Sequence, residues 1–366
     1  MATLADSATQ FTHVAHPAPT PVAERDAVLA NPGFGARFTD HMVVIEYSEE
    51  RGWHGAAVQP YGPIALDPAS SVLHYAQEIF EGLKAYRHPD GSMALFRPEA
   101  NAARFNASAE RLAMPALPEA LFIQAITELV KADREWFPTV EGGALYLRPF
   151  MIATESFLGV RPAKAYKFIV IASPAGNYFK SGTPAVSIWV SDYTRAAPGG
   201  TGAAKCGGNY AASLVPTAEA FAKGHDQVLF LDAAEHKWIE ELGGMNLFFA
   251  FADGSLLTPP LTGTILPGIT RDSLIRLARD EGLAVREERY SLDQWRADAA
   301  SGQLVEVFAC GTAAVVTPVG QVADRDGAFT IGSGGPGQLT GKLKARLTAI
   351  QRGAQADPHD WVHRIG

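Results

Sequence analysis

Residues 198–210 read PGGTGAAKCGGNY, and this glycine-rich stretch holds one lysine, Lys205, on backbone that a ligand can approach closely. A P-loop requires Gly directly before its lysine and Ser or Thr after it, whereas Ala204 and Cys206 occupy those places. The dinucleotide-binding pattern fails as well, because Lys205 stands where its third glycine belongs. The stretch favours a lysine nucleophile, whose amine in a partly desolvated pocket can form a Schiff base. An ordinary lysine in a glycine-rich turn is the alternative.

A pyridoxal phosphate (PLP) enzyme also needs a carboxylate for the pyridine nitrogen and a cup for the phosphate. Residues 237–251, KWIEELGGMNLFFAF, contain Glu240 and Glu241 in an apolar segment. A carboxylate there is costly unless a cation or a proton donor faces it. The pair is a candidate for the nitrogen partner, with an exposed pair at a strand end as the other interpretation.

The candidate phosphate cup lies in residues 258–278, TPPLTGTILPGITRDSLIRLA, where a Pro-Gly turn is predicted to enter a helix near Ile269 and Thr270. The first N–H groups of a helix bind phosphate without any special side chain. Thr270 adds a hydroxyl to this cup or serves as an N-cap. A second turn of small residues, ACGTAAVV at 309–316, offers Thr312. Each of the two turns is ordinary when taken alone. They indicate a phosphate site only because they occur together with the lysine and the glutamate pair.

Composition limits the class of protein. The chain has 366 residues, of which 47% are hydrophobic and only 19% charged, so it can bury a large core and is not disordered. A net charge of −8 without a basic run argues against nucleic acid or an anionic membrane as partner. The two cysteines form neither a CxxC pair nor a Cys/His cluster, so we expect no disulfide and no metal site. No apolar run reaches the roughly 18 residues of a membrane span, and we expect a cytoplasmic protein.

The chain is predicted to be an α+β protein of two domains with the site in the cleft between them. An arm is expected over residues 1–33, a small α+β domain over 34–172, a loop between the domains at 173–185, and a large domain over 186–366. Apolar runs predict strands and 3.6-residue periodicity predicts helices within both domains. The predicted strands cover 42–47, 93–96, 144–152, 166–172, 187–190, 227–232, 246–252, 304–310 and 313–319. The predicted helices cover 98–114, 118–137, a segment near 210–222, one from about 270, and one near 340–352.

Seven segments together resemble the branched-chain amino acid aminotransferases, PLP enzymes of fold type IV in the class IV aminotransferase family. In chain order they are LHYAQEIFEGLKAYR, LFRPEANAARFNASAERL, YLRPFMI, AAKCGGNYAASL, EELGGMN, LTPPLTGTILPGITRDSL and FACGTAAVVTPV. The resemblance runs from about Phe34 to the region of Trp361. It implies that the large domain is an α/β barrel-like domain that binds PLP.

The resemblance also implies roles for individual residues. Lys205 matches the lysine that binds PLP covalently and moves the proton, and Tyr210 matches the tyrosine that hydrogen-bonds the phenolic oxygen of PLP. Glu241 rather than Glu240 matches the pyridine-nitrogen partner, because it directly precedes LGGMN. The phosphate is assigned to Arg104, Ile269, Thr270 and Thr312. The substrate is assigned to Phe34, Tyr75, Tyr146, Arg148, Gly244, Thr312 and Ala313.

The implied reaction transfers the amino group between leucine, isoleucine or valine and 2-oxoglutarate. In family dimers, the tyrosine matching Tyr75 and the loop matching Leu158 and Val160 reach the neighbouring subunit's site, so a homodimer is expected. D-amino acid aminotransferase and 4-amino-4-deoxychorismate lyase share the lysine and the glutamate and remain alternatives of the same fold. A non-catalytic phosphate- or nucleotide-binding protein is the alternative from another class. Some animal members carry a CxxC pair where this chain has Ala314 and Thr317, so a thiol switch of that kind is not expected.

Overall fold

The computed structural model describes residues 9–176 and 185–366. The chain divides into two compact units, one made of Met1–Tyr178 and Asp357–Gly366, the other of Phe179–Ala356. Each unit is built on its own sheet, with nine strands in each sheet among the described residues. None of the helices formed by these residues is long and apolar enough to cross a membrane.

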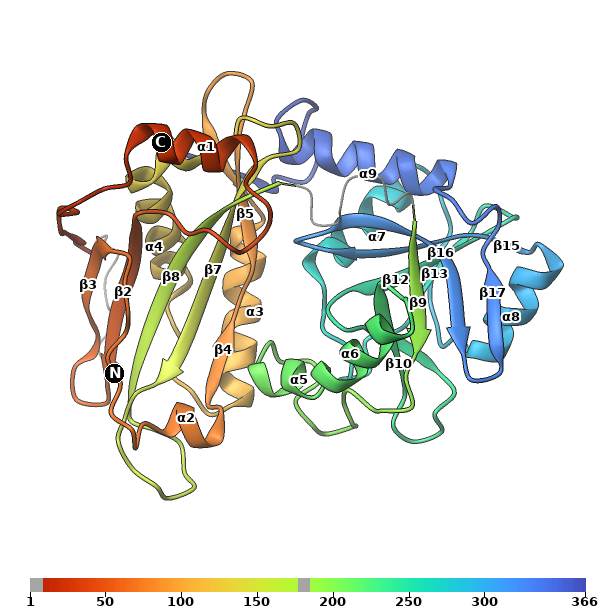
Figure 1. Ribbon diagram of the computed structural model, residues 1–366, viewed down its shortest axis with the longest axis horizontal. Coiled ribbons are helices and arrows are strands. Elements are labelled where there is room, and N and C mark those ends of the chain that lie inside the picture. The colour runs from red at the N-terminus through yellow and green to blue at the C-terminus, as the bar shows by residue number, and fades with distance from the viewer. Residues whose placement is uncertain (1–8, 177–184) are drawn as a thin grey trace. The chain divides into compact units, whose positions relative to one another are not determined.

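The first unit is a mainly antiparallel sheet with helices (Figure 1). Its strands are β1 (Thr12–His13), β2 (His41–Ser48), β3 (Gly52–Pro60), β4 (Glu78–Phe80), β5 (Leu83–Arg87), β6 (Met93–Phe96), β7 (Ala144–Ala153), β8 (Ala165–Ala175) and β18 (Val362–Ile365). Its helices are α1 (Val22–Ala30), α2 (Ser71–Tyr75), α3 (Pro98–Arg111) and α4 (Glu119–Ala132), with a 3-10 turn at Arg134–Trp136. The strand order is β1-β3-β2-β8-β7-β5-β6-β18, and β4 pairs with β7.

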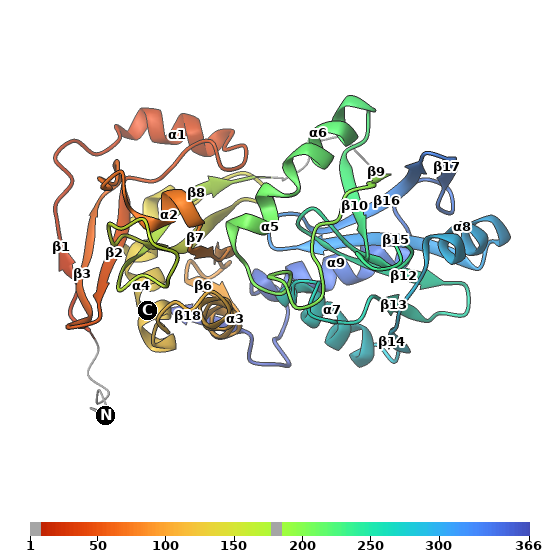
Figure 2. The ribbon, with the colours of Figure 1, turned by 90° about the horizontal axis from the view of Figure 1, so that it is seen from below.

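Apolar faces of α3 and α4 form the core of this unit. Phe105 of α3, Phe122 of α4 and Phe168 of β8 pack with ring centroids 5.3 to 5.7 Å apart, and all three side chains are buried. Seen from below, α3 and α4 lie on one side of the sheet and α1 lies toward the other (Figure 2). The long β7–β8 pair is therefore supported on one face, while alternate β7 side chains point to the other face.

The second unit contains strands β9 (Val186–Val190), β10 (Gln227–Leu231), β11 (Ile239–Leu242), β12 (Asn246–Phe251), β13 (Leu256–Thr258), β14 (Val285–Glu287), β15 (Leu304–Gly311), β16 (Val315–Asp324) and β17 (Gly327–Thr330). Its helices are α5 (Gly207–Ala211), α6 (Leu214–Ala222), α7 (Ile269–Asp280), α8 (Leu292–Ser301) and α9 (Gln338–Gln351). The strand order is β11-β10-β9-β16-β15-β12-β13-β14, and β17 pairs with β16. The sheet is mixed, since β9 runs parallel to β10 and β16 while β12, β15 and β16 are antiparallel.

Helices cover both faces of this second sheet. Figure 2 shows α5 and α6 on one side of it and α7 and α9 on the other. The fully buried Trp295 of α8 packs edge to face on Phe249 of β12, with ring centroids 4.9 Å apart. Strand β12, which pairs with β15, is thereby packed against α8.

The structure confirms the predicted α+β class and nearly all of the predicted elements. Helix α1, inside the expected arm, was not predicted, because Val22–Ala30 buries only Leu29 and has no capping side chain. The predicted helix near 210–222 is broken into α5 and α6.

The units observed differ from the predicted domains at the C-terminus. Asp357–Gly366 belongs to the first unit because β18 pairs with β6, a contact between distant segments that local patterns do not reveal. In the predicted loop 173–185, residues 173–175 belong to β8 and residues 177–184 lie outside the described residues.

Candidate active site

Lys205 stands two residues before the start of the short helix α5, and Tyr210 lies on that helix. Its Nζ donates a hydrogen bond to the Tyr210 hydroxyl over 2.8 Å and lies 5.2 Å from the centre of the tyrosine ring. The neighbours Ala204 and Cys206 are buried, whereas Lys205 and Tyr210 are half-buried. The sequence analysis assigned both residues to PLP, and in the structure they contact each other.

Asn209 fixes the glycine-rich loop that precedes Lys205, a role that was missed in the sequence. Its Nδ2 donates to the carbonyl oxygens of Thr201 and Ala204, both at 2.8 Å, and its Oδ1 accepts from the Thr201 hydroxyl at 2.7 Å. A Cβ on Gly202 would lie 2.6 Å from the Thr264 carbonyl oxygen. Glycine is therefore required where this loop touches the segment that leads into α7.

Glu241 of β11 is buried among donors from three segments. Its Oε1 accepts from the Leu266 N–H at 3.0 Å and pairs with Arg195 Nη2 at 2.5 Å, while Asn246 Nδ2 lies 3.4 Å from Oε2. Burial raises the pKa of Glu241 to about 6, and the charges of Arg195 and Lys205 oppose that rise. Glu241 thus remains ionised near neutral pH only with the help of nearby cations.

Glu240, the neighbouring carboxylate, is also buried. The Thr264 hydroxyl donates to its Oε1 at 2.5 Å, and its Oε2 has no hydrogen-bond partner among the described residues. Burial raises the pKa of Glu240 as well. Arg195 forms an ion pair with Glu241, whereas Glu240 forms none among the described residues, so this region can accept a further proton donor or cation.

The helix α7 begins at Ile269 as predicted, and Gly268 at its N-cap has no capping side chain. A Cβ on Gly268 would lie 2.0 Å from Asn246 Oδ1, and Asn246 Nδ2 donates to the Leu266 carbonyl oxygen at 3.1 Å. Asn246 therefore joins Glu241 to the turn that enters α7. The first N–H groups of a helix have no acceptor within it, so this end can receive an anion.

Thr312 and Ala313 lie in the turn between β15 and β16, and both are half-buried. The turn packs on Gly244, because a Cβ on Gly311 would lie 3.5 Å from the Gly244 carbonyl oxygen. A Cβ on Gly244 would in turn lie 3.9 Å from the Tyr210 ring. The second unit therefore brings together the predicted residues Lys205, Tyr210, Glu241, Gly244, Ile269, Thr270, Thr312 and Ala313.

Both cysteines near this cluster are buried and free. Burial raises the pKa of the Cys310 thiol to about 12, so it remains protonated near neutral pH. Cys310 is thus a packing residue here rather than a reactive thiolate.

Three of the predicted substrate residues line one cavity of about 180 Å³ in the first unit. They are Phe34, Tyr146 and Arg148, and the cavity also touches Phe38 and Ile171. Tyr146 and Arg148 lie two residues apart on β7 and so share a face. Phe34 packs edge to face on Tyr146 with ring centroids 5.0 Å apart.

Arg148 is held by aromatic groups. Its Nη2 donates to the Tyr146 hydroxyl at 3.1 Å, and its Cζ lies 4.8 Å from the centre of the Phe80 ring. Its Nε is buried without a hydrogen-bond partner in the part of the chain that the structure describes. The cavity therefore combines an apolar wall with a cation, which suits a ligand that has both an aliphatic part and a carboxylate.

Gly82 limits where Tyr146 can lie. A Cβ on Gly82 would stand 2.2 Å from the Tyr146 hydroxyl oxygen, so any side chain there displaces the phenol. In the sequence Gly82 stands out only as part of a motif, because nothing local shows which ring packs on it.

Arg104 on α3 makes a bidentate ion pair with Glu81. Arg104 Nε lies 2.7 Å from Glu81 Oε1 and Nη2 lies 2.8 Å from Oε2, and the Glu81 side chain is 0% exposed. Asn101 Nδ2 donates to the same Glu81 Oε2 at 2.7 Å. Glu81, which was missed in the sequence, thus fixes the guanidinium of the predicted phosphate residue.

Tyr75 does not line the cavity of the first unit. It ends α2, is exposed, and donates from its hydroxyl to the Leu158 carbonyl oxygen. Leu158 and Val160 are 68% and 86% exposed, which is unusual for aliphatic side chains. The segment around Leu158 and Val160 therefore exposes apolar side chains on the surface of the first unit.

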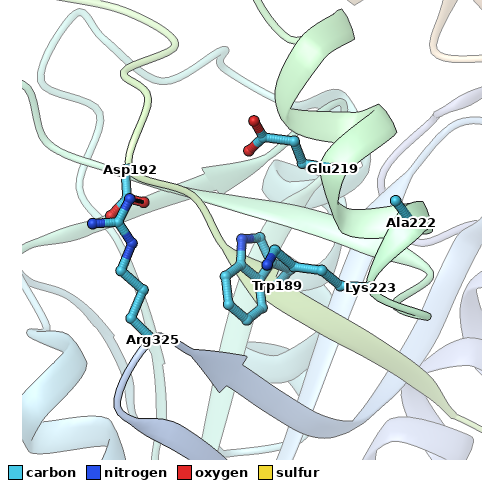
Figure 3. A pocket seen from close by; sticks show the side chains of 6 residues that line it. All are labelled: Trp189, Asp192, Glu219, Ala222, Lys223 and Arg325. Carbon is cyan, nitrogen blue, oxygen red and sulfur yellow. Dashed lines mark ion pairs between the residues drawn. The ribbon is translucent and has the colours of Figure 1, made fainter.

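A further cavity of about 370 Å³ lies on the second unit and contains none of the predicted residues (Figure 3). Arg325 pairs with Asp192, and Lys223 Nζ lies 4.5 Å from the centre of the Trp189 ring. Of the two cations that line it, Arg325 therefore has a carboxylate partner and Lys223 lies over a ring.

Comparisons with known proteins agree on one family. Residues 78–322 match the family described as amino-transferase class IV. A branched-chain-amino-acid aminotransferase of Mycolicibacterium smegmatis is 57% identical over 97% of this chain and 98% of its own length. A probable branched-chain-amino-acid aminotransferase of Streptomyces coelicolor is 60% identical over 94% and 95%. The solved structure of the branched-chain amino acid aminotransferase from Escherichia coli superposes with a TM-score of 0.73 at 29% identity, covering 89% of this chain and 99% of that one.

Proposed function

Because the chain belongs to the class IV aminotransferases, and among them to the branched-chain-amino-acid aminotransferase family, we propose that it transfers the amino group between leucine, isoleucine or valine and 2-oxoglutarate. Class IV aminotransferases depend on PLP. The observation that carries the proposal is the contact of Lys205 with Tyr210 beside the buried Glu241, in a chain 57% to 60% identical to such enzymes.

The residues of the second unit fit PLP. Of the two buried carboxylates, Glu241 forms an ion pair with Arg195 and Glu240 forms none among the described residues, and a protonated pyridine nitrogen would supply a second cation. The turn that enters α7 leads to a helix start whose N-cap residue, Gly268, has no capping side chain, and a helix start can bind phosphate. When bound, PLP supplies the electron sink that makes the Cα–H bond of an amino acid acidic.

Lys205 is the catalytic base of the proposed reaction. Its Nζ holds the cofactor before the amino acid arrives and then removes the proton from the substrate Cα. The Tyr210 hydroxyl, 2.8 Å from Nζ, orients the amine and is assigned to the phenolic oxygen of PLP. Glu241 is assigned to the pyridine nitrogen.

The phosphate is assigned to the start of α7, through Ile269 and Thr270, and to Thr312. Arg104 is assigned to the phosphate as well, with Glu81 fixing the direction of its guanidinium. The start of α7 and Thr312, both in the second unit, offer hydrogen-bond donors to an anion, which suits a phosphate.

Substrate recognition is assigned to two kinds of group. The Phe34 and Tyr146 rings supply apolar surface for a branched side chain, and Arg148 supplies a cation for the second carboxylate of glutamate. Tyr75, Gly244 and Ala313 are assigned to the substrate on the family resemblance.

We also propose a homodimer that works in the cytoplasm. Exposed apolar side chains support the dimer, namely Leu158 and Val160 in the first unit and Leu214, Val215 and Phe221 on α6. The two buried free cysteines are compatible with a reducing compartment. Sedimentation of the purified protein tests the dimer, and a monomer at micromolar concentration would contradict it.

The experiment that tests the function is a spectroscopic screen of L- and D-amino acids on the PLP-loaded protein. We expect the visible band to shift with L-leucine, L-isoleucine, L-valine and L-glutamate, and to return on adding 2-oxoglutarate. A shift with D-alanine alone would favour the D-amino acid aminotransferase alternative. Release of pyruvate from 4-amino-4-deoxychorismate would favour the lyase. A colourless protein that takes up no PLP would favour a non-catalytic binding protein.

A further inference from the structure

Arg195 lies between β9 and the glycine-rich loop, in a segment for which the sequence predicted no role. Its side chain is only 6% exposed. Within the described residues, its Nη2 approaches three oxygens on three segments: Glu241 Oε1 at 2.5 Å, the Thr264 carbonyl at 2.5 Å and the Gly202 carbonyl at 3.2 Å. One buried guanidinium nitrogen thus contacts the glutamate and both loops beside it.

The positive charge of Arg195 favours the ionised form of Glu241. Burial raises the pKa of Glu241, and the Arg195 charge is the largest opposing effect. The other titratable groups that influence Glu241 are Lys205, which also lowers its pKa, and Glu240, which raises it; the nearby Cys310 thiol is uncharged near neutral pH. Because the amine of Lys205 must be neutral to react, Arg195 is the permanent cation of this group.

Arg195 also joins the glycine-rich loop to the segment that leads into α7. Gly202 lies three residues before Lys205, and Thr264 lies in the segment that leads into α7. Arg195 bonds to the carbonyl oxygens of both, at the place where Gly202 has no room for a side chain. Movement of Arg195 would therefore disturb the glutamate and both loops together.

We propose that Arg195 is a positioning residue that keeps Glu241 ionised and directed at the pyridine nitrogen of the cofactor. The proposal rests on the proposed function, because it assumes that PLP binds beside Glu241. Arg195 touches neither cofactor nor substrate in this assignment and acts through Glu241.

The test is a double-mutant cycle on the full-length protein with Arg195→Met, Glu241→Gln and the double variant. The main measurement is the dissociation constant of PLP, with kcat and KM for leucine as further readouts. Loss of a neighbouring opposite charge shifts a carboxyl pKa by about 1 to 3 units, so we expect Arg195→Met to weaken PLP binding by about 10- to 100-fold at pH 7. We expect kcat to fall with little change in KM for leucine, and the double variant to resemble Glu241→Gln. If the PLP dissociation constant of the double variant rose by the product of the two single increases, the two residues would act independently and the proposal would be overturned.

The pH dependence separates this role from a merely structural one. Without Arg195, Glu241 takes up a proton near neutral pH and loses it again as the pH rises. The ratio of the PLP dissociation constants of variant and wild type should therefore decrease between about pH 7 and pH 9. A ratio that stays constant over this range would contradict the proposal. If the Arg195→Met variant does not fold, the same measurements can be made on Arg195→Gln, which also removes the charge.

Two further variants complete the experiment. Arg195→Lys retains the charge and should restore most of the PLP affinity at pH 7, although it loses the planar fork of the guanidinium. Arg296→Met removes another arginine of the second unit, which pairs with Asp324 at 2.6 Å, and should leave the PLP dissociation constant unchanged. The two proposals fail in different ways. If wild-type protein bound PLP but no amino acid shifted the visible absorption band, the proposed function would fail. The double-mutant cycle would still measure the coupling between Arg195 and Glu241 in PLP binding.

Discussion

The two units bury opposite kinds of unmatched charge. In the second unit, Arg195 forms an ion pair with Glu241, whereas the adjacent buried Glu240 has no ion pair and its Oε2 has no hydrogen-bond partner among the described residues. In the first unit, Arg148 has no carboxylate partner in the part of the chain that the structure describes, and rests instead on the Phe80 ring and the Tyr146 hydroxyl. One region lacks a cation and the other lacks an anion.

This difference indicates which ligand groups each region accommodates. Burying an unpaired charge costs free energy, and a cation over an aromatic face recovers only about 0.5 to 2 kcal/mol. By contrast, Arg104 of the first unit, which is half-buried like Arg148, has a matched carboxylate in Glu81. The unmatched groups therefore lie where the proposed reaction supplies the counter-charge: a pyridine nitrogen for Glu241 and a substrate carboxylate for Arg148.

The largest effect is expected from Lys205→Ala, which removes the reactive amine of the second unit. We expect turnover of leucine with 2-oxoglutarate to fall by more than about 10⁴-fold, because covalent attachment and proton transfer are both lost. Some PLP should still bind, since the carboxylates and the phosphate cup remain. Rate assays and absorbance spectra measure the two effects.

Lys223→Ala is the control for this prediction, because Lys223 lines the surface cavity of the same unit. It should retain wild-type turnover. Wild-type turnover in Lys205→Ala would overturn the catalytic assignment.

Arg148→Met tests the first unit by removing its unmatched cation. A hydrogen bond to a charged group contributes about 1.5 to 3 kcal/mol, so the KM for 2-oxoglutarate should rise by about 10- to 100-fold. The KM for leucine should change much less, because leucine has no second carboxylate. Arg87→Met is the matched control, since Arg87 also lies over a ring, that of Phe137, on the same unit. Equal increases in both KM values would refute the division of roles.

Gly82→Ala should produce a weaker change in the same direction. The added Cβ would stand 2.2 Å from the Tyr146 hydroxyl and force the phenol away from Arg148. Because the cation itself remains and loses only the phenol that holds it, we expect a rise of about 2- to 10-fold in the KM for 2-oxoglutarate. Gly62→Ala, where a Cβ meets no atom within 4 Å, should leave both KM values unchanged. An unchanged KM in Gly82→Ala would show that the position of the phenol does not matter.

Local patterns in the sequence predicted about half of the strands and the longer helices, but not β3, β5, β11 or α8. The start of α7 at Ile269 was predicted because a Pro-Gly turn followed by helical periodicity is a local signal. The strand β7 was predicted because its apolar run is local too. The helix α1 and the return of β18 to the first unit were missed, since neither has a local signal of that strength.

The candidate site shows the same limit. Lys205, Tyr210 and Glu241 stand in recognisable motifs, so the resemblance identified them. Arg195 and Glu81 were missed because their partners, Glu241 and Arg104, lie in other segments of the chain. Which carboxylate meets which arginine depends on packing, and a single sequence does not show packing.

The smallest effect is expected from Glu240→Gln, which removes the unmatched carboxylate of the second unit while keeping an oxygen for the Thr264 hydroxyl. Burial raises the pKa of Glu240 in the folded protein above its unfolded value, so ionisation of Glu240 destabilises the fold increasingly as the pH rises above about 4.5. The variant should therefore raise the Tm of the PLP-free protein by about 2 °C at pH 8 and leave it unchanged near pH 4. Glu288→Gln on the exposed surface should show no such pH dependence. A gain that is equal at both pH values would mean that the charge of Glu240 is already compensated, and the contrast between the two units would then rest on Arg148 alone.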